Sequence, residues 1–348
     1  MSQPEYASPS LEVWKDLYEA AAQFKRIESW NWLDDSSTFG VQDPVTKTIA
    51  YCSVMGALGE LYGLAAYVGT EGLLALQKMA FGETDYSDIN LGKDMRCLMT
   101  TFESRNDLDK PDIEVIRQLG LSFRGKHNWP RFRSYEPGFF PWYLDAHEAM
   151  FVTTILQQAV DVCLRAKDDP DLIPNWDDEV YLVRVAEEKD GELVWEDRML
   201  SPELLPEPEL EDSVHIDELQ LMKIRNSAKT TDAVWDADLF YAPACVQEDP
   251  KSRPYYPLMS LWVDHGTGLI IGTKMAGHDD YRQAFVDELI NMVNQDNVKP
   301  REIRVKREDA YRLYEGVASK LGIPMRKVQS LGMLEGIQAD LAEFLMRR

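Results

Sequence analysis

The feature that most constrains the fold is an acidic, proline-rich stretch that interrupts the chain after its first 200 residues. Residues 201–218 read SPELLPEPELEDSVHIDE, where prolines and like charges favour an extended connection over a packed element. A chain of 348 residues also exceeds the size at which one hydrophobic core stops growing. We therefore predict a mixed α+β domain over 1–200 that ends in an acidic hairpin, a linker over 201–218 and an α/β domain over 219–348.

The negative charge of the chain is concentrated around this linker. Residues 168–218 hold 19 acids and three bases, a balance of −16, so the remainder carries only −7 of the total of −23. A field of this sign repels phosphates over a Debye length, which makes nucleic acid an unfavourable partner for the acidic middle of the chain. Two interpretations stay open: a solvated connector, or a surface that meets a basic protein partner of unknown identity.

No segment predicts contact with a membrane. The sequence contains no run of 18 or more apolar residues, and its start, MSQPEYASPS, lacks the basic and apolar regions of a signal peptide. We therefore expect a cytoplasmic protein without a membrane anchor. Its cysteines have no CxxC spacing and lie among apolar neighbours, so we expect four buried thiols and no metal cluster. They are Cys52, Cys97, Cys163 and Cys245.

The first domain mixes helical and strand patterns. An amphipathic helix opens it, and short strand-like runs separated by glycines follow over 39–68. Asp145 and Glu148 have the spacing of a capping box and predict the start of a long helix. The segment EVYLVRVAEEKDGELVWEDRML alternates with period two on both sides of KDG, which predicts a hairpin that turns at Asp190 and Gly191.

The second domain alternates strands and helices. PLMSLWVDHGTGLIIGTKM predicts two strands joined by a tight HGTG turn, and helices then alternate with the strands EIRVK and PMRKVQS. The predicted order is β-β-α-β-α-β-α, in which helices cover a mixed sheet. The chain as a whole is thus predicted to be α+β.

Three stretches resemble an uncharacterised bacterial family that is built from two adjoining domains of unknown function. They are WNWLDDSSTFGVQDPVTKTIAYCSVMGALGELYGLAAYVGTEG, FRSYEPGFFPWYLDAHEA and YYPLMSLWVDHGTGLIIG. The resemblance covers most of the chain and supports its division into two domains. It implies no activity, so it says nothing about mechanism.

The C-terminal order of elements is similar to a ribonuclease H-like fold, whose enzymes hold metal ions with acids on the first strand, a later strand and the final helix. This similarity implies Asp264 for the first position and offers Asp340 and Glu343 as candidates for the last. The later strand carries Lys306 and Arg307 where an acid is expected, and Asp309 follows too late. Cations at this point would oppose the binding of Mg or Mn.

Two functions are weighed on these grounds. The preferred one is a non-catalytic binding or interaction protein without a cofactor, because the acids needed for chemistry are out of register. The alternative is a metal-dependent nuclease that uses Mg or Mn held by Asp264, Asp309 and Glu343. The five histidines are scattered and none lies in a GxSxG or HExxH context, so the sequence gives no reason to expect a hydrolase of either type.

A candidate ligand site lies in MGALGELYG, a glycine-rich segment that lacks the lysine and hydroxyl pair of a P-loop. Glu60 in this segment is interpreted in two ways. It is either a buried acid paired with Arg96 or Arg105, or an acid that contacts a ligand in a pocket rimmed by Tyr62 and Tyr67.

A second candidate for binding is the aromatic segment YEPGFFPWYLD, which includes Trp142. Its five aromatic residues and two prolines predict a stiff loop with a flat apolar surface. Such a surface either grips a partner or closes the domain as a buried plug. Together, Glu60, Tyr62, Tyr67 and Trp142 are the predicted ligand-binding residues.

Overall fold

The computed structural model describes residues 8–34, 36–81, 93, 95–174, 179–204 and 214–346, and it divides the chain into two compact units. Unit 1 contains the described residues through Leu204 except Lys93 and Gly138–Phe140; unit 2 contains these exceptions and the described residues from Val214 onward. The division between 206 and 207 falls inside the stretch predicted as a linker, whose residues 205–213 lie outside the described part. Helices and mixed sheets in both units confirm the α+β fold class.

Unit 1 is built on a seven-stranded sheet in the order β5-β4-β3-β2-β1-β6-β7. Neighbouring strands are antiparallel except β1 and β6, which are parallel. Its elements are α1(Leu11–Ile27), η1(Ser29–Asn31), β1(Thr38–Gln42), β2(Ile49–Met55), β3(Tyr62–Val68), α2(Gly69–Ala80), β4(Cys97–Glu103), η2(Arg105–Asp107), α3(Lys110–Gln118), β5(Trp129–Tyr135), α4(Ala146–Asp168), η3(Pro170–Leu172), β6(Tyr181–Lys189) and β7(Glu192–Leu200).

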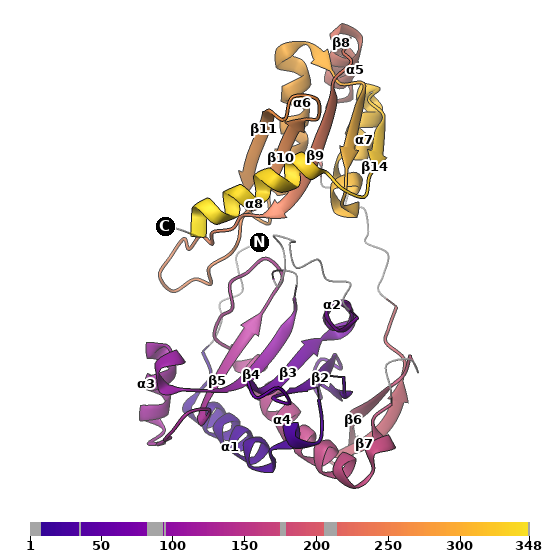
Figure 1. The fold of residues 1–348 in the computed structure, drawn as a ribbon. Helices are drawn as coiled ribbons and strands as arrows, with labels where there is room; N and C mark the ends of the chain where they lie inside the picture. Colours follow the sequence, from indigo (N-terminus) through magenta and orange to yellow (C-terminus); the bar gives the residue numbers. More distant parts are fainter. Residues whose placement is uncertain are drawn as a thin grey trace. The chain divides into compact units, whose positions relative to one another are not determined.

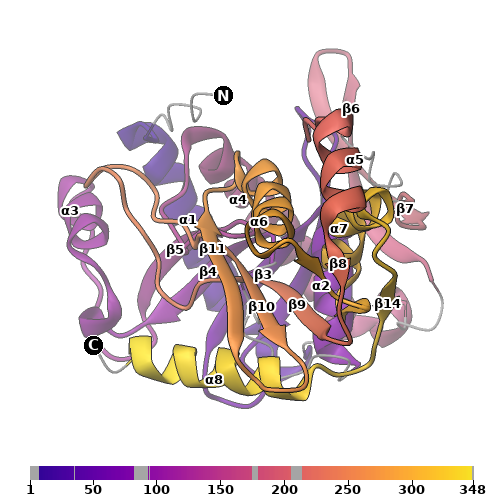
Figure 2. The same ribbon diagram turned by 90° about the horizontal axis from the view of Figure 1, so that it is seen from above.

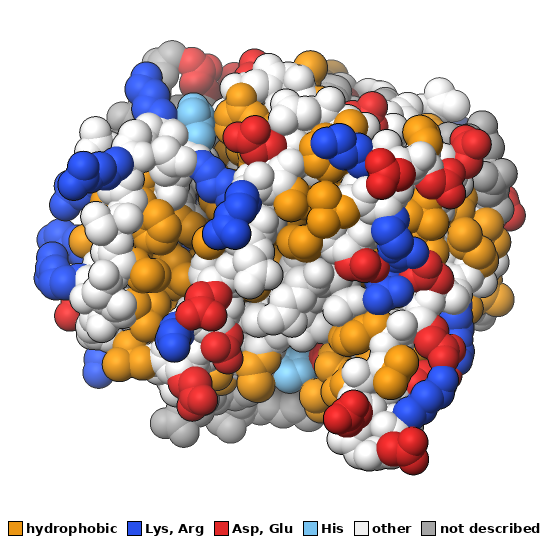
Figure 3. Space-filling view, turned by 90° about the horizontal axis from the view of Figure 1, so that it is seen from below, with side chains coloured by type: hydrophobic (Ala, Val, Ile, Leu, Met, Phe, Trp, Pro, Cys, Tyr) orange, Lys and Arg blue, Asp and Glu red, His pale blue; other side chains and the backbone are white. Residues whose placement is uncertain are grey.

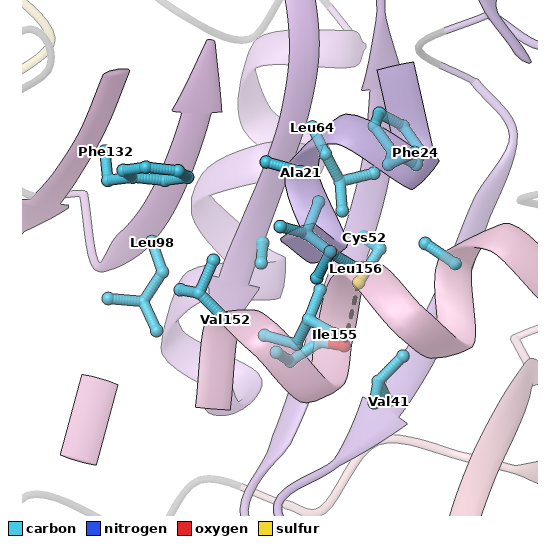
Figure 4. Close-up of a cluster of buried hydrophobic side chains, with 14 of the residues drawn as sticks. Ala21, Phe24, Val41, Cys52, Leu64, Leu98, Phe132, Val152, Ile155 and Leu156 are labelled. Carbon is cyan, nitrogen blue, oxygen red and sulfur yellow. Dashed lines mark hydrogen bonds between the residues drawn. The ribbon is translucent and has the colours of Figure 1, made fainter. Parts of the chain in front are cut away.

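Helices cover both faces of this sheet (Figure 1). Helices α1 and α4 pack on one face, and their apolar stripes meet alternate residues of the central strands in the main core (Figure 4). Helix α2 covers the other face with Leu73 and Leu76. Because alternate residues of a strand point to opposite faces, Leu64 enters the first core and Tyr67 the second.

The local signals in unit 1 predicted its elements well. The Asp145 side chain accepts a hydrogen bond from the Glu148 backbone N–H at 2.8 Å, and the Glu148 carboxylate accepts one from the backbone N–H of Asp145, so the capping box is confirmed. The β6–β7 hairpin turns at Asp190 and Gly191, whose φ angles of 54° and 81° are those that a tight hairpin turn requires.

Unit 2 is built on a five-stranded sheet in the order β11-β10-β9-β13-β14, with a separate pair β12-β8. Strands β9, β10 and β11 form an antiparallel meander, whereas β13 pairs parallel with both β9 and β14. Its elements are α5(Glu218–Ser227), β8(Lys229–Thr230), β9(Val234–Tyr241), β10(Leu258–Asp264), β11(Ile270–Ala276), α6(Tyr281–Asp296), β12(Val298–Lys299), β13(Glu302–Val305), α7(Glu308–Leu321), β14(Met325–Lys327) and α8(Gly332–Met346).

The main sheet of unit 2 also separates two cores. Helices α5, α6 and α7 pack on one face, and α8 crosses the strands on the other, as Figure 2 shows from above. The predicted element order is incomplete, because it lacks helix α5, strand β9 and the short strands β8 and β12. The meander therefore has three strands rather than two. The HGTG turn is therefore confirmed between the second and third strands of the meander, rather than between the first and second.

Three of the four cysteines are buried as predicted, and the fourth, Cys245, is exposed. Burial raises the pKa of both Cys97 and Cys163 to about 12, so these thiols stay protonated and act as small apolar groups. None of the described helices combines the length and the apolar character needed to cross a membrane.

Candidate functional site

The acids proposed for a nuclease do not converge. Asp264 ends β10, which is the second strand of the sheet in unit 2, and its carboxylate accepts hydrogen bonds from the N–H and Oγ1 of Thr267 at 2.8 Å. These bonds lower the pKa of Asp264 and identify it as a turn-forming residue. Asp309 accepts a bond from the N–H of Ala310 in the first turn of α7, and Glu343 is exposed on α8.

The first strand of the meander instead carries two other acids, Asp236 and Asp238. Both are almost completely buried, with exposed fractions of 1% and 6%. Their side chains point to the face covered by α8, because Ala237 and Leu239 between and beside them belong to the opposite core. The sequence analysis missed these acids because it did not recognise VWDADLFY as a strand.

Asp236 is neutralised by a buried ion pair. Its oxygens accept hydrogen bonds from Nε and Nη2 of Arg304 at 2.8 and 3.0 Å, which is a bidentate arrangement. The partner lies on the adjacent strand β13, directly opposite in register. His265 Nδ1 is 3.0 Å from the same carboxylate. The charge of Asp236 is thus fully engaged by neighbouring side chains.

Asp238 lies two residues further along the strand in a less polar setting. Its Oδ2 accepts a hydrogen bond of 2.9 Å from Nε2 of Gln338 on α8, and its Oδ1 has no hydrogen-bond partner among the described residues. Burial raises the pKa of Asp238 to about 6, and the nearby charge of Arg307 only partly opposes this. The residue of the final helix that contacts Asp238 is therefore Gln338, an amide, rather than an acid.

The groups around Asp238 do not fit a divalent metal ion. Arg304 on β13 pairs with Asp236, and the positive charge of Arg307, just after this strand, acts on Asp238. The sequence indicated cations at the end of this strand. A half-buried acid, Glu288 on α6, bonds to Ser260 and Trp262 on the opposite side of the sheet, so it cannot share an ion with Asp238. Among the described residues, no three His, Cys, Asp or Glu side chains are arranged to hold a metal.

The predicted ligand residues are divided between the two ends of the sheet in unit 1. Glu60 is exposed in the β2–β3 turn, so its interpretation as a buried, paired acid is wrong. Tyr62 is half-buried at the start of β3, whereas Tyr67 is buried in the core of the opposite face. Trp142 forms a two-way backbone bridge with Ser134 at the far end of the strands. The structure therefore does not bring these residues into one pocket.

One of them, Tyr62, does line a groove in unit 1. The groove has a volume of about 550 Å³ and combines aromatic and basic side chains from three segments of the chain, 25–31, 56–62 and 126–128. Its lining consists of Lys25, Glu28, Trp30, Asn31, Gly56, Ala57, Leu58, Gly59, Tyr62, Lys126, His127 and Asn128. We call it the Trp30–Tyr62 groove.

Aromatic contacts hold the wall of this groove in place. The rings of Trp30 and Tyr62 have centroids 5.1 Å apart, and Tyr62 also contacts the His127 ring edge-on at 5.2 Å. Behind them, Trp30 packs against Phe24 and Phe102, which are fully buried. The two groove rings are therefore anchored in the core of unit 1 while remaining half-exposed.

Lys25 ties the basic side of the groove to the loop before β5. Its ammonium group donates to the carbonyl oxygen of His127 and to Oδ1 of Asn128. His127 has a φ of 53°, a left-handed conformation that is uncommon for a residue other than glycine. Burial lowers the pKa of Lys25, with Glu28 opposing the shift. The loop is thus held in a strained conformation next to the aromatic pair.

A second cavity of about 280 Å³ lies at the opposite end of the strands of unit 1 and includes Asp43, Ser134, His147 and Glu148. Asp43 is held by the Oγ1 of Thr46 at 2.8 Å and by Nε2 of His147 at 3.0 Å. Glu148 accepts a 2.6 Å bond from Ser134. Because these acids already have protein partners, the cavity offers a weaker site than the Trp30–Tyr62 groove.

Comparison with protein families matches both halves of the chain. Residues 14–184 match a domain of unknown function, DUF7309, and residues 220–342 match another, DUF6930. These matches confirm the resemblance to two adjoining domains of unknown function. No curated protein matches the chain.

Proposed function

We propose, from geometry alone, that the chain is a non-catalytic binding protein. The two domain families that it matches, DUF7309 and DUF6930, carry no activity in their names. In this proposal, unit 2 is a structural scaffold and the Trp30–Tyr62 groove of unit 1 is the binding site. The observation that carries the proposal is the pairing of Asp238 with Gln338, with Arg304 on the neighbouring strand.

The side chains of unit 2 support its interpretation as a structural scaffold. Two-metal catalysis requires several carboxylates that converge on ions about 3.5–4 Å apart. Here one aspartate is held by Arg304, and the other accepts a hydrogen bond from an amide at one oxygen and lies near the charge of Arg307. Below about pH 6 a proton also competes with a metal ion for Asp238, since ligation requires the ionised form.

The rival function is a metal-dependent nuclease, and the strand order β11-β10-β9-β13-β14 favours it, because it resembles the order of a ribonuclease H-like sheet. In such an enzyme the acid on the first strand would be Asp236 or Asp238, instead of Asp264. The family likeness alone is a weak argument for activity, since one fold supports many functions.

A cleavage assay separates the two functions. The purified full chain is incubated with Mg or Mn and with single-stranded and double-stranded DNA and RNA. We expect no metal-dependent cleavage by the wild type. Cleavage that Asp238→Asn abolishes and Asp264→Asn leaves intact would establish the nuclease and reject the proposal. Loss of cleavage in Asp264→Asn would instead restore the sequence-based assignment of that residue.

A further inference from the structure

We propose that the Trp30–Tyr62 groove binds a nucleotide unit, with its base against the two aromatic rings and its phosphate beside Lys25 and Lys126. The inference rests on the proposed binding function and names the ligand class. Free nucleotides and exposed single-stranded nucleic acid share this chemistry of a planar base joined to a phosphate. The first step of the argument is the shape of the groove, whose volume of about 550 Å³ lies within the range of small-molecule sites.

The aromatic wall suits a planar ligand. Trp30 and Tyr62 are half-buried, so each ring keeps part of its surface available while the core of unit 1 fixes its position. Stacking of a base on such a ring contributes about 1–3 kcal/mol and tolerates any base. Because the rings are anchored before a ligand arrives, little conformational entropy is lost on binding.

The charge around the groove suits a phosphate. Lys126 is exposed on its rim, and the ammonium group of Lys25 has three N–H donors, of which the loop carbonyl and amide oxygens use two. Glu28 is the acid in the lining. The lysines therefore outnumber the acids there by two to one, so the lining is locally cationic in a chain whose net charge is −23.

The segment that contains Lys126 also has a positive net charge. Residues 105–133 contain seven bases and four acids, a balance of +3 in a chain that is otherwise acidic. In Figure 3, Lys and Arg side chains gather at the left edge, the side on which α3 of this segment lies in Figure 1. One of these bases, Lys126, lines the groove, and the attraction between such a cation and an anionic ligand is screened by salt.

The test uses the full chain with two probes, adenosine monophosphate and a fluorescein-labelled ten-residue oligothymidylate, each titrated at low and high salt. Adenosine and inorganic phosphate serve as probes of the base and the phosphate alone. Tryptophan fluorescence reports the first probe and fluorescence anisotropy the second. We expect at least one probe to bind, adenosine and phosphate to bind more weakly than adenosine monophosphate, and salt to weaken binding.

Variants then locate the site. Lys126→Glu is exposed, so it leaves the fold intact, and we expect it to weaken binding about fivefold or more. Tyr62→Ala removes the stacking surface and should weaken binding about tenfold, with circular dichroism confirming its fold. The matched control is Lys47→Glu, an exposed charge reversal in the β1–β2 turn at the other end of the sheet, which should have no effect.

The outcomes distinguish the sources and the possible failures. Binding of adenosine monophosphate alone assigns a free nucleotide, and binding of the oligonucleotide alone assigns a single strand. If neither probe binds, the nucleotide inference is rejected while the binding function stands. If a probe binds but both groove variants match the wild type, this groove is rejected as the nucleotide site. Metal-dependent cleavage in the separate assay would reject the proposed function itself.

Discussion

Nε2 of Gln338 lies 2.9 Å from Oδ2 of Asp238, and this hydrogen bond joins the last helix of the chain to the first strand of the sheet in unit 2. Both side chains are more than nine-tenths buried. The amide is a neutral donor, so it cannot offset the cost of burying a full negative charge. The pair is therefore more stable when the carboxyl group is protonated, which gives the unit a pH dependence.

The first prediction concerns this pH dependence. The pKa of Asp238 rises from 3.8 to about 6 on folding, so the folded state binds the proton more tightly than the unfolded state. The stabilisation is complete below pH 3.8 and is lost as the pH rises through 6. The difference of about two pKa units corresponds to about 3 kcal/mol. Asp238→Asn cannot ionise, so the variant should gain up to that amount relative to the wild type between pH 3.5 and 7.

Urea denaturation of both proteins across this pH range measures the effect. Asp264→Asn is the control, because hydrogen bonds from Thr267 lower the pKa of Asp264. Its carboxylate contributes stability above its unfolded pKa, and that stability is lost as the pH falls. The two variants should therefore differ from the wild type with opposite signs of pH dependence. Parallel curves for the wild type and Asp238→Asn would contradict the raised pKa.

The second prediction concerns the ion pair of Asp236 and Arg304. Arg304→Ala leaves a carboxylate with 1% exposure next to an empty space, and we expect the free energy of unfolding to fall by about 3–5 kcal/mol. Chemical denaturation measures this loss. The control is Arg326→Ala, which breaks a pair with Glu302 in which the arginine is 60% exposed; we expect a change below about 1 kcal/mol. Equal losses of unfolding free energy for the two variants would show that the buried ion pair contributes no more to stability than the exposed one.

Local sequence signals predicted much of the fold. The capping box at Asp145 and the turn at Asp190 and Gly191 depend on residues a few positions apart, and both are confirmed. Strand β9 was missed although its apolar residues alternate with two aspartates, a pattern that would place these charges on a solvated face. These charges are accommodated only through Arg304 and Gln338, which lie 68 and 100 residues away. A single sequence contains no signal for such a pairing.

The candidate site was only partly predictable for the same reason. Tyr62 was selected from its glycine-rich neighbourhood, and it does line the groove. The other wall residues come from the end of α1 and the loop before β5, about 30 to 65 positions away. Glu60 was selected on the same grounds, but the turn that gives the segment its glycines also exposes this side chain. The glycine-rich sequence therefore identified one segment of the Trp30–Tyr62 groove, but not the distant residues that complete it.

The third prediction concerns Gly56, which follows β2 beneath the groove. It has a φ of 138°, and an added Cβ would lie 2.7 Å from Cδ1 of Tyr62 and 2.9 Å from Cβ of Trp30. Gly56→Ala should therefore displace the two rings and lower the free energy of unfolding by about 2–4 kcal/mol. Tryptophan emission should shift to longer wavelength as Trp30 moves.

The control for this substitution is Gly120→Ala. Gly120 also has a positive φ, 67°, but an added Cβ would meet no atom within 4 Å. The substitution therefore introduces backbone strain without a clash, and the expected cost is about 1–2 kcal/mol with unchanged tryptophan emission. If Gly56→Ala behaves like this control, the rings are free to move and the groove is not held in place by its turn.

The last prediction tests the support beneath the groove and the sheet of unit 1. Leu156 is fully buried in the middle of α4 and points toward the strands in the core (Figure 4). Leu156→Ala should lower the free energy of unfolding by about 2–5 kcal/mol, because it removes apolar contacts and leaves a cavity. Leu164→Ala lies on the same helix with 45% exposure and should change stability by less than about 0.5 kcal/mol. Denaturation followed by circular dichroism measures both. A comparable loss for Leu164→Ala would mean that its side of α4 is covered, which would contradict the packing of this helix against a single face of the sheet.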